Sequence, residues 1–339
     1  MRRRSVLLAV PALLLTAAGC GSKDDKSDAA SSPSGSPSGS SAPSGSPSAT
    51  PGTKIVGGPV PEITAGSAFN QKPTIAKGAG TPAKDLAVKT VIPGSGPTIA
   101  SGDYVQVNYV GQVYDTAKVF DTSFGRGPYT NVIGQGKVIP GWDRGLVGQK
   151  VKSRVELAIP PALGYGSAGN SQAGIKGTDT LVFVIDVLQR FNGKSSATGA
   201  AVPQKDASLP KVGTNTDGKA PSIDVPKGAK GKAPTKLVSE YILEGDGAVV
   251  KATDNLLLQY KGVLWDTGKE FDSTYGRGEL AAFPLAQLIK GWQQGLAGKK
   301  VGSRVMLVTP PDVAYGNKAN NGIPANSTLV FTLDILALL

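Results

Sequence analysis

The most informative part of this chain is Lys137-Val138-Ile139-Pro140-Gly141-Trp142-Asp143-Arg144-Gly145-Leu146, which returns 150 residues later as Gln287-Leu288-Ile289-Lys290-Gly291-Trp292-Gln293-Gln294-Gly295-Leu296. Each copy has two aliphatic residues before a Gly-Trp pair and a Gly-Leu pair after it. This order predicts a strand or loop that enters a brief helix. A tryptophan at the start of such a helix is most often an ordinary core residue, so its role depends on what surrounds both copies.

The second half of the chain repeats the first at a nearly constant offset. Equivalent aromatic and proline residues are 148 to 151 positions apart: Tyr109 and Tyr260, Phe120 and Phe271, Trp142 and Trp292, Pro160 and Pro310, Tyr165 and Tyr315, and Phe183 and Phe331. The similarity begins earlier, where Lys72-Pro73-Thr74-Ile75 is echoed by Ala220-Pro221-Ser222-Ile223. Because each unit is of domain size and far longer than a solenoid repeat, the pattern predicts a tandem duplication of a whole domain.

The N-terminus has the pattern of a secretory signal. Arg2-Arg3-Arg4 form a positive region, and an apolar run follows from Val6 to Ala18. The run is too short to span a bilayer as a helix. It ends Leu15-Thr16-Ala17-Ala18-Gly19-Cys20, which resembles a bacterial lipobox apart from Ala17, and this resemblance implies lipidation of Cys20. An ordinary secreted protein with an incidental cysteine is the alternative.

Composition separates a tether from the folded units. Residues 22–53 contain no large apolar side chain and are rich in Ser, Pro and Gly, so they cannot offset the entropy of ordering. We therefore divide the chain into a signal peptide (1–19), a disordered tether (20–65), a first domain (66–191), a Gly-, Ser- and Lys-rich linker (192–216) and a second domain (217–339). A lipid on Cys20 followed by a tether would hold the domains at the outer face of a cell membrane.

Charge and residue usage exclude several kinds of function. The net charge is +11 and falls to +8 without the three N-terminal arginines, but the lysines are scattered, which argues against nucleic-acid binding. The chain has no His, which removes the usual general base and the commonest metal ligand, and one Cys, which leaves no disulfide and no cysteine metal cluster. We expect no metal site and no cofactor. Attraction to an anionic surface is the simpler use of the basic charge.

Strand patterns dominate each unit. Residues 104–110 alternate between polar and apolar, with Gly111 expected to end the strand. Further strands are predicted at 151–159 and 181–188, and in the second unit at 255–260, 301–309 and 328–336. One short helix fits each unit, at 141–147 and 291–297. The predicted class is α+β, with each domain an antiparallel sheet wrapped on one short helix.

Six blocks in the same order in both units resemble the FKBP-type peptidyl-prolyl cis-trans isomerases. In the first unit they are Tyr109, Phe120-Asp121-Thr122-Ser123 with Gly125-Arg126-Gly127, Val138-Ile139-Pro140-Gly141-Trp142, Pro160-Pro161, Gly164-Tyr165-Gly166, and Thr180-Leu181-Val182-Phe183. The second unit has Tyr260, Phe271-Asp272 with Gly276-Arg277-Gly278, Leu288-Ile289-Lys290-Gly291-Trp292, Pro310-Pro311, Ala314-Tyr315-Gly316 and Thr328-Leu329-Val330-Phe331. The resemblance covers roughly residues 85–190 and 235–339.

The resemblance implies an aromatic substrate pocket in each domain. Its apolar lining would be Tyr109, Phe120, Tyr129, Val138, Ile139, Trp142 and Phe183 in the first domain, and Tyr260, Phe271, Leu288, Ile289, Trp292 and Phe331 in the second. Its polar catalytic groups would be Asp121, Tyr165, Asp272 and Tyr315. Ile175 and Ile323 would lie at the pocket edge, and Arg126 and Arg277 would hold the Asp and Tyr groups in place.

The implied function is isomerisation of X-Pro bonds in secreted or cell-envelope proteins. This reaction breaks no covalent bond, so it needs neither a nucleophile nor a metal. The partners implied are proline-containing unfolded or extended polypeptides, and the family's macrolide inhibitors. Two alternatives stay open: a non-catalytic chaperone or Pro-peptide-binding lipoprotein whose two pockets act together, and a structural scaffold of the envelope. The aromatic residues could be plain core, and the Asp residues could simply begin turns.

The two copies depart from the family pattern at different places. The first domain has Ile175-Lys176 where the second has Ile323-Pro324, which implies a looser or more polar pocket rim in the first domain. The second has Leu288 in place of Val and Leu280 near the aromatic position. We therefore expect both sites to be active and the first to be the weaker.

Overall fold

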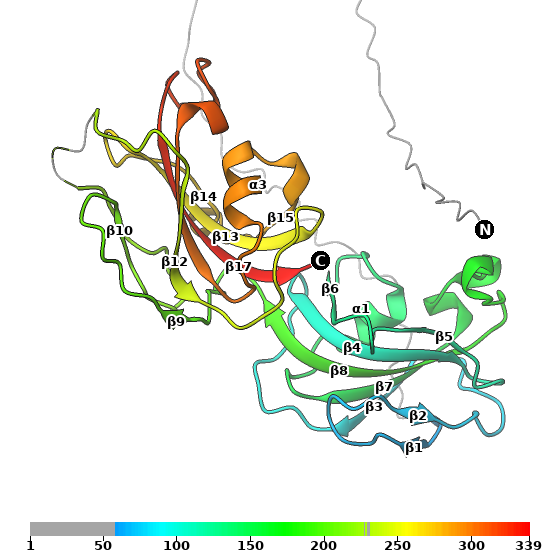
Figure 1. Cartoon of the computed structure of the whole chain (residues 1–339). Helices are drawn as coiled ribbons and strands as arrows, with labels where there is room; N and C mark the ends of the chain where they lie inside the picture. Colours follow the sequence, from blue (N-terminus) through cyan, green and yellow to red (C-terminus); the bar gives the residue numbers. More distant parts are fainter. Residues whose placement is uncertain (1–57, 227, 229–230) are drawn as a thin grey trace, which may run out of the picture. The chain divides into compact units, whose positions relative to one another are not determined.

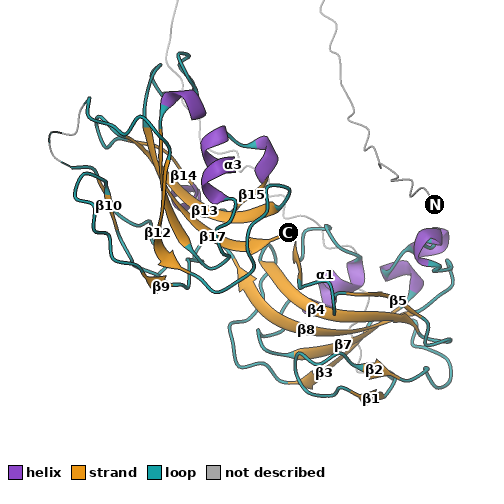
Figure 2. Cartoon of the chain, in the orientation of Figure 1, coloured by secondary structure: helices purple, strands orange, loops and turns teal. Residues whose placement is uncertain are grey.

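The computed structural model describes residues 58–226, 228 and 231–339, and it contains two domains of the same architecture. Each is an antiparallel sheet that curves around one short helix, which confirms the predicted α+β class (Figures 1 and 2). The expected signal peptide, Cys20 and most of the expected tether lie outside the described residues. No helix in the described part of the chain is long and apolar enough to cross a membrane.

In the first domain the strand order is β3-β7-β8-β4-β5, and β6 pairs with the other half of β4. The elements are β3 (Ala87–Ile92), β4 (Tyr104–Val113), β5 (Val119–Thr122), β6 (Tyr129–Val132), α1 (Pro140–Leu146), β7 (Arg154–Ile159) and β8 (Leu181–Phe191). A two-stranded hairpin precedes them, formed by β1 (Ile63–Ala65) and β2 (Thr74–Ile75).

In the second domain the order is β14-β13-β17-β16-β12-β9, and β15 also pairs with β13. The elements are β12 (Val238–Glu244), β13 (Asn255–Leu264), β14 (Glu270–Ser273), α2 (Thr274–Arg277), β15 (Ala281–Pro284), α3 (Lys290–Leu296), β16 (Arg304–Thr309) and β17 (Leu329–Leu338). Before them come β9 (Ala200–Ala201) and a hairpin of β10 (Lys211–Val212) and β11 (Ile223–Asp224).

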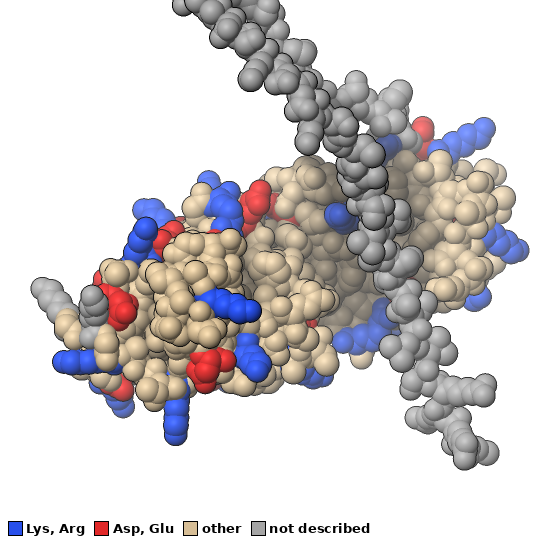
Figure 3. Space-filling view, turned by 90° about the horizontal axis from the view of Figure 1, so that it is seen from above, with Lys and Arg blue, Asp and Glu red and all other residues tan. Residues whose placement is uncertain are grey.

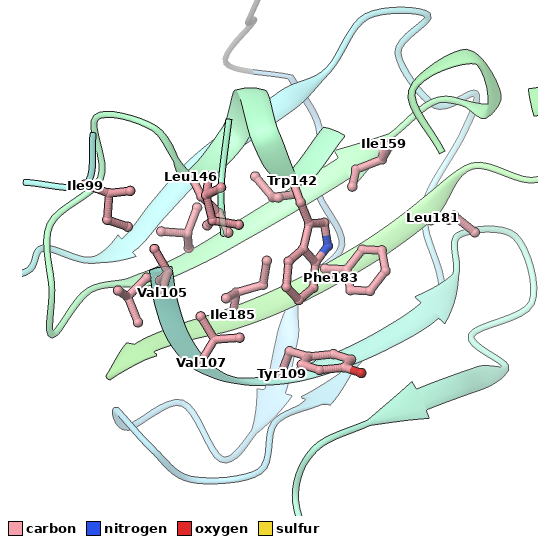
Figure 4. Packing of buried hydrophobic residues seen from close by; sticks show 14 of the residues in the cluster. Ile99, Val105, Val107, Tyr109, Trp142, Leu146, Ile159, Leu181, Phe183 and Ile185 are labelled. Atoms are coloured by element: carbon pink, nitrogen blue, oxygen red, sulfur yellow. The ribbon is translucent and has the colours of Figure 1, made fainter. Parts of the chain in front are cut away.

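The helix-facing side of each sheet carries the main core. In the first domain, Trp142 and Leu146 of α1 pack on Leu157, Phe183 and Ile185 from β7 and β8. Figure 4 shows the indole of Trp142 pointing from α1 toward the sheet, beside Phe183 and above Tyr109. The same residue pattern builds the core of the second domain around Trp292 and Leu296. The repeated stretch is therefore the segment that fixes helix to sheet in both domains.

The strand β4, which contributes Tyr109 to the core, is longer than the sequence predicted. β4 continues through Gly111 to Val113, so the expectation that Gly111 ends the strand is wrong. A Cβ at Gly111 would lie 2.7 Å from Cε1 of Phe183 and 2.8 Å from Cζ of Phe120. Gly262 on β13 has the same relation to Phe271 and Phe331. The glycine therefore provides space for two phenyl rings and does not break the strand.

The structure moves two of the expected boundaries: β1 (Ile63–Ala65), which lies in the expected tether (20–65), pairs with β2, and much of the expected linker (192–216) packs on the outer face of the second sheet. Ile75 of β2 packs on Val110, Val182 and Val184, which alternate with the core residues of β4 and β8. Much of the 192–216 range packs on the second domain: β9 pairs with β12, and Leu209 and Val212 are buried there. The echo between residues 72–75 and 220–223 corresponds to a hairpin in both domains.

In each domain a fully buried arginine–aspartate pair binds the segment that precedes the sheet in the chain and packs on its outer face. Arg304 on β16 donates from Nε and Nη2 to the two carboxylate oxygens of Asp334 on β17, at 2.6 and 2.7 Å. Its Nη1 donates to the backbone carbonyls of Gly213 and Asn215, both at 2.8 Å. The backbone N–H of Ala197 donates to Asp334 at 2.9 Å. These bonds connect the sheet to residues that precede it in the chain.

The first domain repeats this arrangement with other residues. Arg154 binds both carboxylate oxygens of Asp186 and also donates to the carbonyls of Gly66 and Gln71. The backbone N–H of Asn70 donates to Asp186 at 3.0 Å. Residues 66–71 therefore belong to the first domain structurally, because they supply partners for a buried charge that would otherwise be costly.

The remaining charged side chains lie mostly at the surface. Figure 3 shows Lys and Arg side chains spread over the visible face in small groups, with Asp and Glu side chains between them. The scattered lysines of the sequence therefore do not gather into one basic patch on that face.

Glu156 is a buried carboxyl group on the outer face of the first sheet. It is 1% exposed, and neither carboxylate oxygen has a hydrogen-bond partner among the described residues. Burial raises its pKa to about 7, although Lys89 on β3 opposes the shift. The folded state then holds a proton that the unfolded chain loses above pH about 4.3, so stability falls as pH rises from there to about 7.

We predict that Glu156→Met, the residue found at Met306 in the second domain, stabilises the first domain. The expected gain is about 2–3 kcal/mol at pH 8, because the cost of ionising or protonating the buried carboxyl disappears. Most of the gain should vanish near pH 4.5. Urea unfolding of the full chain at the two pH values measures it, with Met306→Glu as the reciprocal variant, expected to destabilise at pH 8. A gain that does not depend on pH would contradict the assignment.

Candidate functional site

A pocket opens on the helix side of the first sheet, with a volume of about 470 Å³. Eleven residues line it: Tyr109, Phe120, Asp121, Tyr129, Gly136, Lys137, Val138, Ile139, Trp142, Tyr165 and Phe183. They come from β4, β5, β6 and β8, from α1 and the segment before it, and from the turn that follows β7. Nine of these eleven residues were predicted from the sequence. The fold brings them together from segments that are far apart in the chain.

The floor of the pocket is the indole of Trp142. Pro140 begins α1, where its missing N–H costs nothing, and the N–H of Trp142 donates to Ile139 O at 2.9 Å. The indole makes edge-to-face contacts with Tyr109 and Phe183, with ring centroids 5.2 and 5.3 Å apart. Trp142 is 5% exposed, so it belongs to the core and to the pocket at once. The sequence left open whether Trp142 is a core residue or a pocket residue, and in the structure it is both.

The polar side of the pocket is a linked set of three groups. The hydroxyl of Tyr109 donates to one oxygen of Asp121, and the guanidinium of Arg126 donates to the other. Burial, followed by the hydrogen bond to Asp121, raises the pKa of Tyr109 above its usual value. Arg126 itself is largely exposed and does not line the cavity. Tyr109 and Arg126 therefore hold Asp121 in place, and this is the role that the resemblance implies for Arg126.

Tyr165 and Ile175 occupy different places. Tyr165 lies at the opening of the pocket and is 37% exposed. Partial burial raises the pKa of its hydroxyl, which is therefore neutral and able to donate at neutral pH. Ile175, in contrast, is buried in the main core cluster and is not among the residues that line the cavity. That Ile175 contacts a bound molecule at the pocket edge therefore stays a prediction.

The second domain has a smaller pocket of about 180 Å³. It is lined by Tyr260, Phe271, Asp272, Phe283, Leu288, Ile289, Trp292, Tyr315 and Phe331. Arg277 and Ile323 do not line it: Arg277 donates to Asp272 from outside, and Ile323 lies in the core. The indole of Trp292 again contacts the rings of Tyr260 and Phe331, each at 5.2 Å. The two sites therefore share one plan.

The ionic groups of the second pocket are also locked together. The hydroxyl of Tyr260 donates to Asp272 at 2.5 Å, and Arg277 donates to both of these residues. Burial, followed by the hydrogen bond to Asp272, raises the pKa of Tyr260 to about 12. Burial alone would raise the pKa of Asp272, but the hydrogen bonds from Tyr260 and Arg277 lower it below its usual value. Around neutral pH the tyrosine is protonated and the aspartate is ionised.

The sequence reasoning missed one aromatic residue of the second pocket. Ala281 faces Leu258 in the β13–β15 pairing, just as Tyr129 faces Val107 in the β4–β6 pairing. The aromatic residue lies two positions further on the same face, at Phe283, which lines the pocket, whereas Leu280 does not. The signal was the alternation along β15, which places residues 281 and 283 on one face.

The arrangement suits the binding of a small apolar ring better than acid–base or nucleophilic chemistry. The lining aspartates are committed to Tyr and Arg partners, and no group of residues in the described ranges has the composition of a metal site. The Tyr315 hydroxyl, whose pKa is raised by partial burial, is neutral and can donate to a bound molecule. An aromatic cup with one neutral hydroxyl at its edge can exclude water and orient a carbonyl group.

Comparison with known proteins shows which family both domains resemble in sequence. The family model for FKBP-type peptidyl-prolyl cis-trans isomerases matches twice, at residues 96–188 and 247–336, which together make up more than half of the chain. The FKBP-type peptidyl-prolyl cis-trans isomerase FkpA of Escherichia coli K12 is 39% identical over 151 residues, which are 44% of this chain and 54% of that protein. This chain therefore matches about half the length of that relative.

Two further similar proteins match parts of the chain. A probable FK506-binding protein of Corynebacterium glutamicum is 41% identical over 117 residues, covering 34% of this chain and 97% of that protein. The crystal structure of FkpA from Escherichia coli is 45% identical, covers 31% of this chain and 48% of its own, and has a TM-score of 0.30.

Proposed function

Because the chain belongs to the family of FKBP-type peptidyl-prolyl cis-trans isomerases, we propose that both of its pockets catalyse rotation about X-Pro peptide bonds. The observation that carries this proposal is the same aromatic cup in both domains, with a neutral tyrosine hydroxyl at its edge and its ionic groups locked together. Nothing in such a site is suited to breaking a covalent bond, and isomerisation requires none.

The physical demand of this reaction fits the cup. The barrier to rotation is about 20 kcal/mol, because the twisted amide loses its resonance. The twisted amide is less polar than the planar one, so a dry aromatic surface favours it relative to water. Lowering the barrier by about 5–6 kcal/mol would shorten tens of seconds to milliseconds. The proline ring would lie against Trp142 or Trp292, and the hydroxyl of Tyr165 or Tyr315 would hold a flanking carbonyl.

Catalysis is distinguished from binding by turnover. We expect the full chain, at a concentration far below that of the substrate, to accelerate cis–trans exchange of a capped Ala-Leu-Pro-Phe peptide, measured by exchange NMR. A pure binding module would need stoichiometric amounts to change the observed exchange and would slow it, because bound peptide is held in one isomer. An exchange rate equal to the uncatalysed rate would exclude the proposed activity.

The substrates we propose are proline-containing segments of unfolded or extended polypeptides outside the cytoplasm. This part of the proposal rests on the lipobox-like Leu15-Thr16-Ala17-Ala18-Gly19-Cys20 and the Ser/Pro/Gly tether that follows. A diacylglycerol on Cys20 would anchor the chain to a bacterial cell membrane, and the tether would let both domains reach nearby chains. Macrolides of the FK506 type are proposed ligands of the same pockets, since one relative is named for binding FK506.

The anchor has its own test. We expect Cys20→Ser to release the protein from the membrane fraction into the medium, because the thiol is the acceptor of the lipid and the chain has no second cysteine to replace it. Fractionation and immunoblotting of cells expressing either form measure this. Ser22→Ala is the control, since it changes a nearby residue and keeps the thiol. Retention of Cys20→Ser in the membrane fraction would count against lipidation.

A further inference from the structure

The two pockets differ in the charge at their edge. Lys137 lines the first pocket, is exposed, and has no ion-pair partner among the described residues. The other charged residue in that lining is Asp121, which is already bound by Arg126 and Tyr109. The first pocket therefore presents one uncommitted positive charge to whatever lies in it.

The second pocket has no such charge in its lining. The residue equivalent to Lys137 is Gln287, which ends a short 3₁₀ turn and does not line the cavity. Lys290 lies nearby at the start of α3, but it also is not a lining residue. Asp272 is the charged residue in the described lining, and Arg277 binds it. Phe283 instead adds apolar surface to this pocket.

We propose that Lys137 makes the first pocket selective for peptides with an acidic residue beside the proline, while the second pocket prefers apolar neighbours. The inference rests on the proposed function and assigns a substrate class to one of its two sites. The larger volume of the first pocket, about 470 Å³ against about 180 Å³, leaves room for a glutamate side chain near the lysine. The two domains then divide a range of substrates between them.

The size of the preference follows from the exposure of Lys137. An exposed ion pair contributes modestly, so we expect a roughly threefold difference in kcat/KM between an acidic peptide and its neutral isostere. Such an interaction is screened by salt, so the preference should disappear near 0.5 M NaCl, where the Debye length is about 4–5 Å. A difference that arises from shape alone would survive the added salt.

The test compares capped Ala-Glu-Pro-Glu with capped Ala-Gln-Pro-Gln by exchange NMR. The parent is the full chain carrying Phe271→Ala, so that the first pocket provides most of the activity. We expect Lys137→Gln to bring the ratio of the two kcat/KM values from roughly threefold to about one, and Lys137→Glu to invert it. Lys84→Gln is the matched control, because Lys84 is exposed in the same domain and does not line the pocket.

The outcomes separate the inference from the proposed function. If the parent accelerates neither peptide, the proposed activity of the first pocket fails. If it accelerates both and the ratio is the same in the parent, Lys137→Gln and Lys137→Glu, the activity stands and the selectivity is wrong. A ratio that changes equally in Lys84→Gln would show an effect of overall charge and would also overturn the inference.

Discussion

Replacing Asp334 with alanine is expected to lower the free energy of unfolding of the second domain by about 3–5 kcal/mol. The carboxylate is 1% exposed and receives donors from Arg304, from the backbone of Ala197 and from the Tyr275 hydroxyl. Without it the guanidinium of Arg304 stays buried and has lost its carboxylate partner, although the backbone carbonyls of Gly213 and Asn215 still accept from it. Urea unfolding of the full chain, followed by tryptophan fluorescence, measures the loss.

The exposed pair of Asp217 and Lys219 provides the matched control. Lys219 Nζ lies 3.7 Å from a carboxylate oxygen of Asp217 and both side chains are more than half exposed, so Asp217→Ala should cost far less than Asp334→Ala. The double variant Arg304→Met/Asp334→Leu removes both charges and should regain most of the stability. If Asp334→Ala costs no more than Asp217→Ala, the buried pair does not hold the 192–216 segment to the sheet.

Gly262→Val is expected to abolish most of the activity of the second pocket while leaving the first pocket working. A Cβ at this position would lie 2.5 Å from Cζ of Phe271 and 3.0 Å from Cε1 of Phe331, so both rings must move toward the cavity. Valine is favoured in β-strands, so a loss of activity or stability would not come from the backbone preference of the new residue. We expect a loss of about tenfold or more in rate and a destabilisation of about 1–3 kcal/mol from overpacking.

This variant is measured in a full chain whose first pocket carries Phe120→Ala. Gly276→Ala is the control, because a Cβ there meets nothing within 4 Å. Gly111→Val tests the equivalent space in the first domain. An unchanged rate in folded Gly262→Val would mean that the positions of the two phenyl rings do not matter for the reaction.

Sequence reasoning was sufficient for the duplicated fold and for most of the pocket lining. Aromatic residues repeated at an offset of 148 to 151 define positions that a single copy would leave ambiguous, which is why Trp142 and Phe183 could be placed together in advance. The family resemblance then supplied the polar groups, and the structure shows Asp121 and Tyr165 lining one cavity.

The features that sequence reasoning missed depend on contacts between distant segments. Composition made residues 192–216 look like a linker, but Arg304 and Asp334 supply a buried charge to which backbone groups of this range bind. From the sequence alone, Gly111 is expected to end its strand. The glycine is needed because two phenyl rings, from Phe120 on β5 and Phe183 on β8, occupy the space beside it, and these two strands are distant from each other in the sequence. Glu156 lies in a strand that the sequence predicted, but its burial depends on packing that the strand pattern does not show.

The most direct test of the central claim compares four full-length chains: wild type, Phe120→Ala, Phe271→Ala and the double variant. Each phenyl ring forms one wall of one pocket, so its removal should disable that site and leave the other in place. We expect exchange of an Ala-Leu-Pro-Phe peptide to be accelerated by each single variant, with contributions above the uncatalysed rate that add up to the wild-type acceleration. The double variant should return the rate to the uncatalysed value. Wild-type acceleration by a folded double variant would show that these pockets are not where the proline bond is turned.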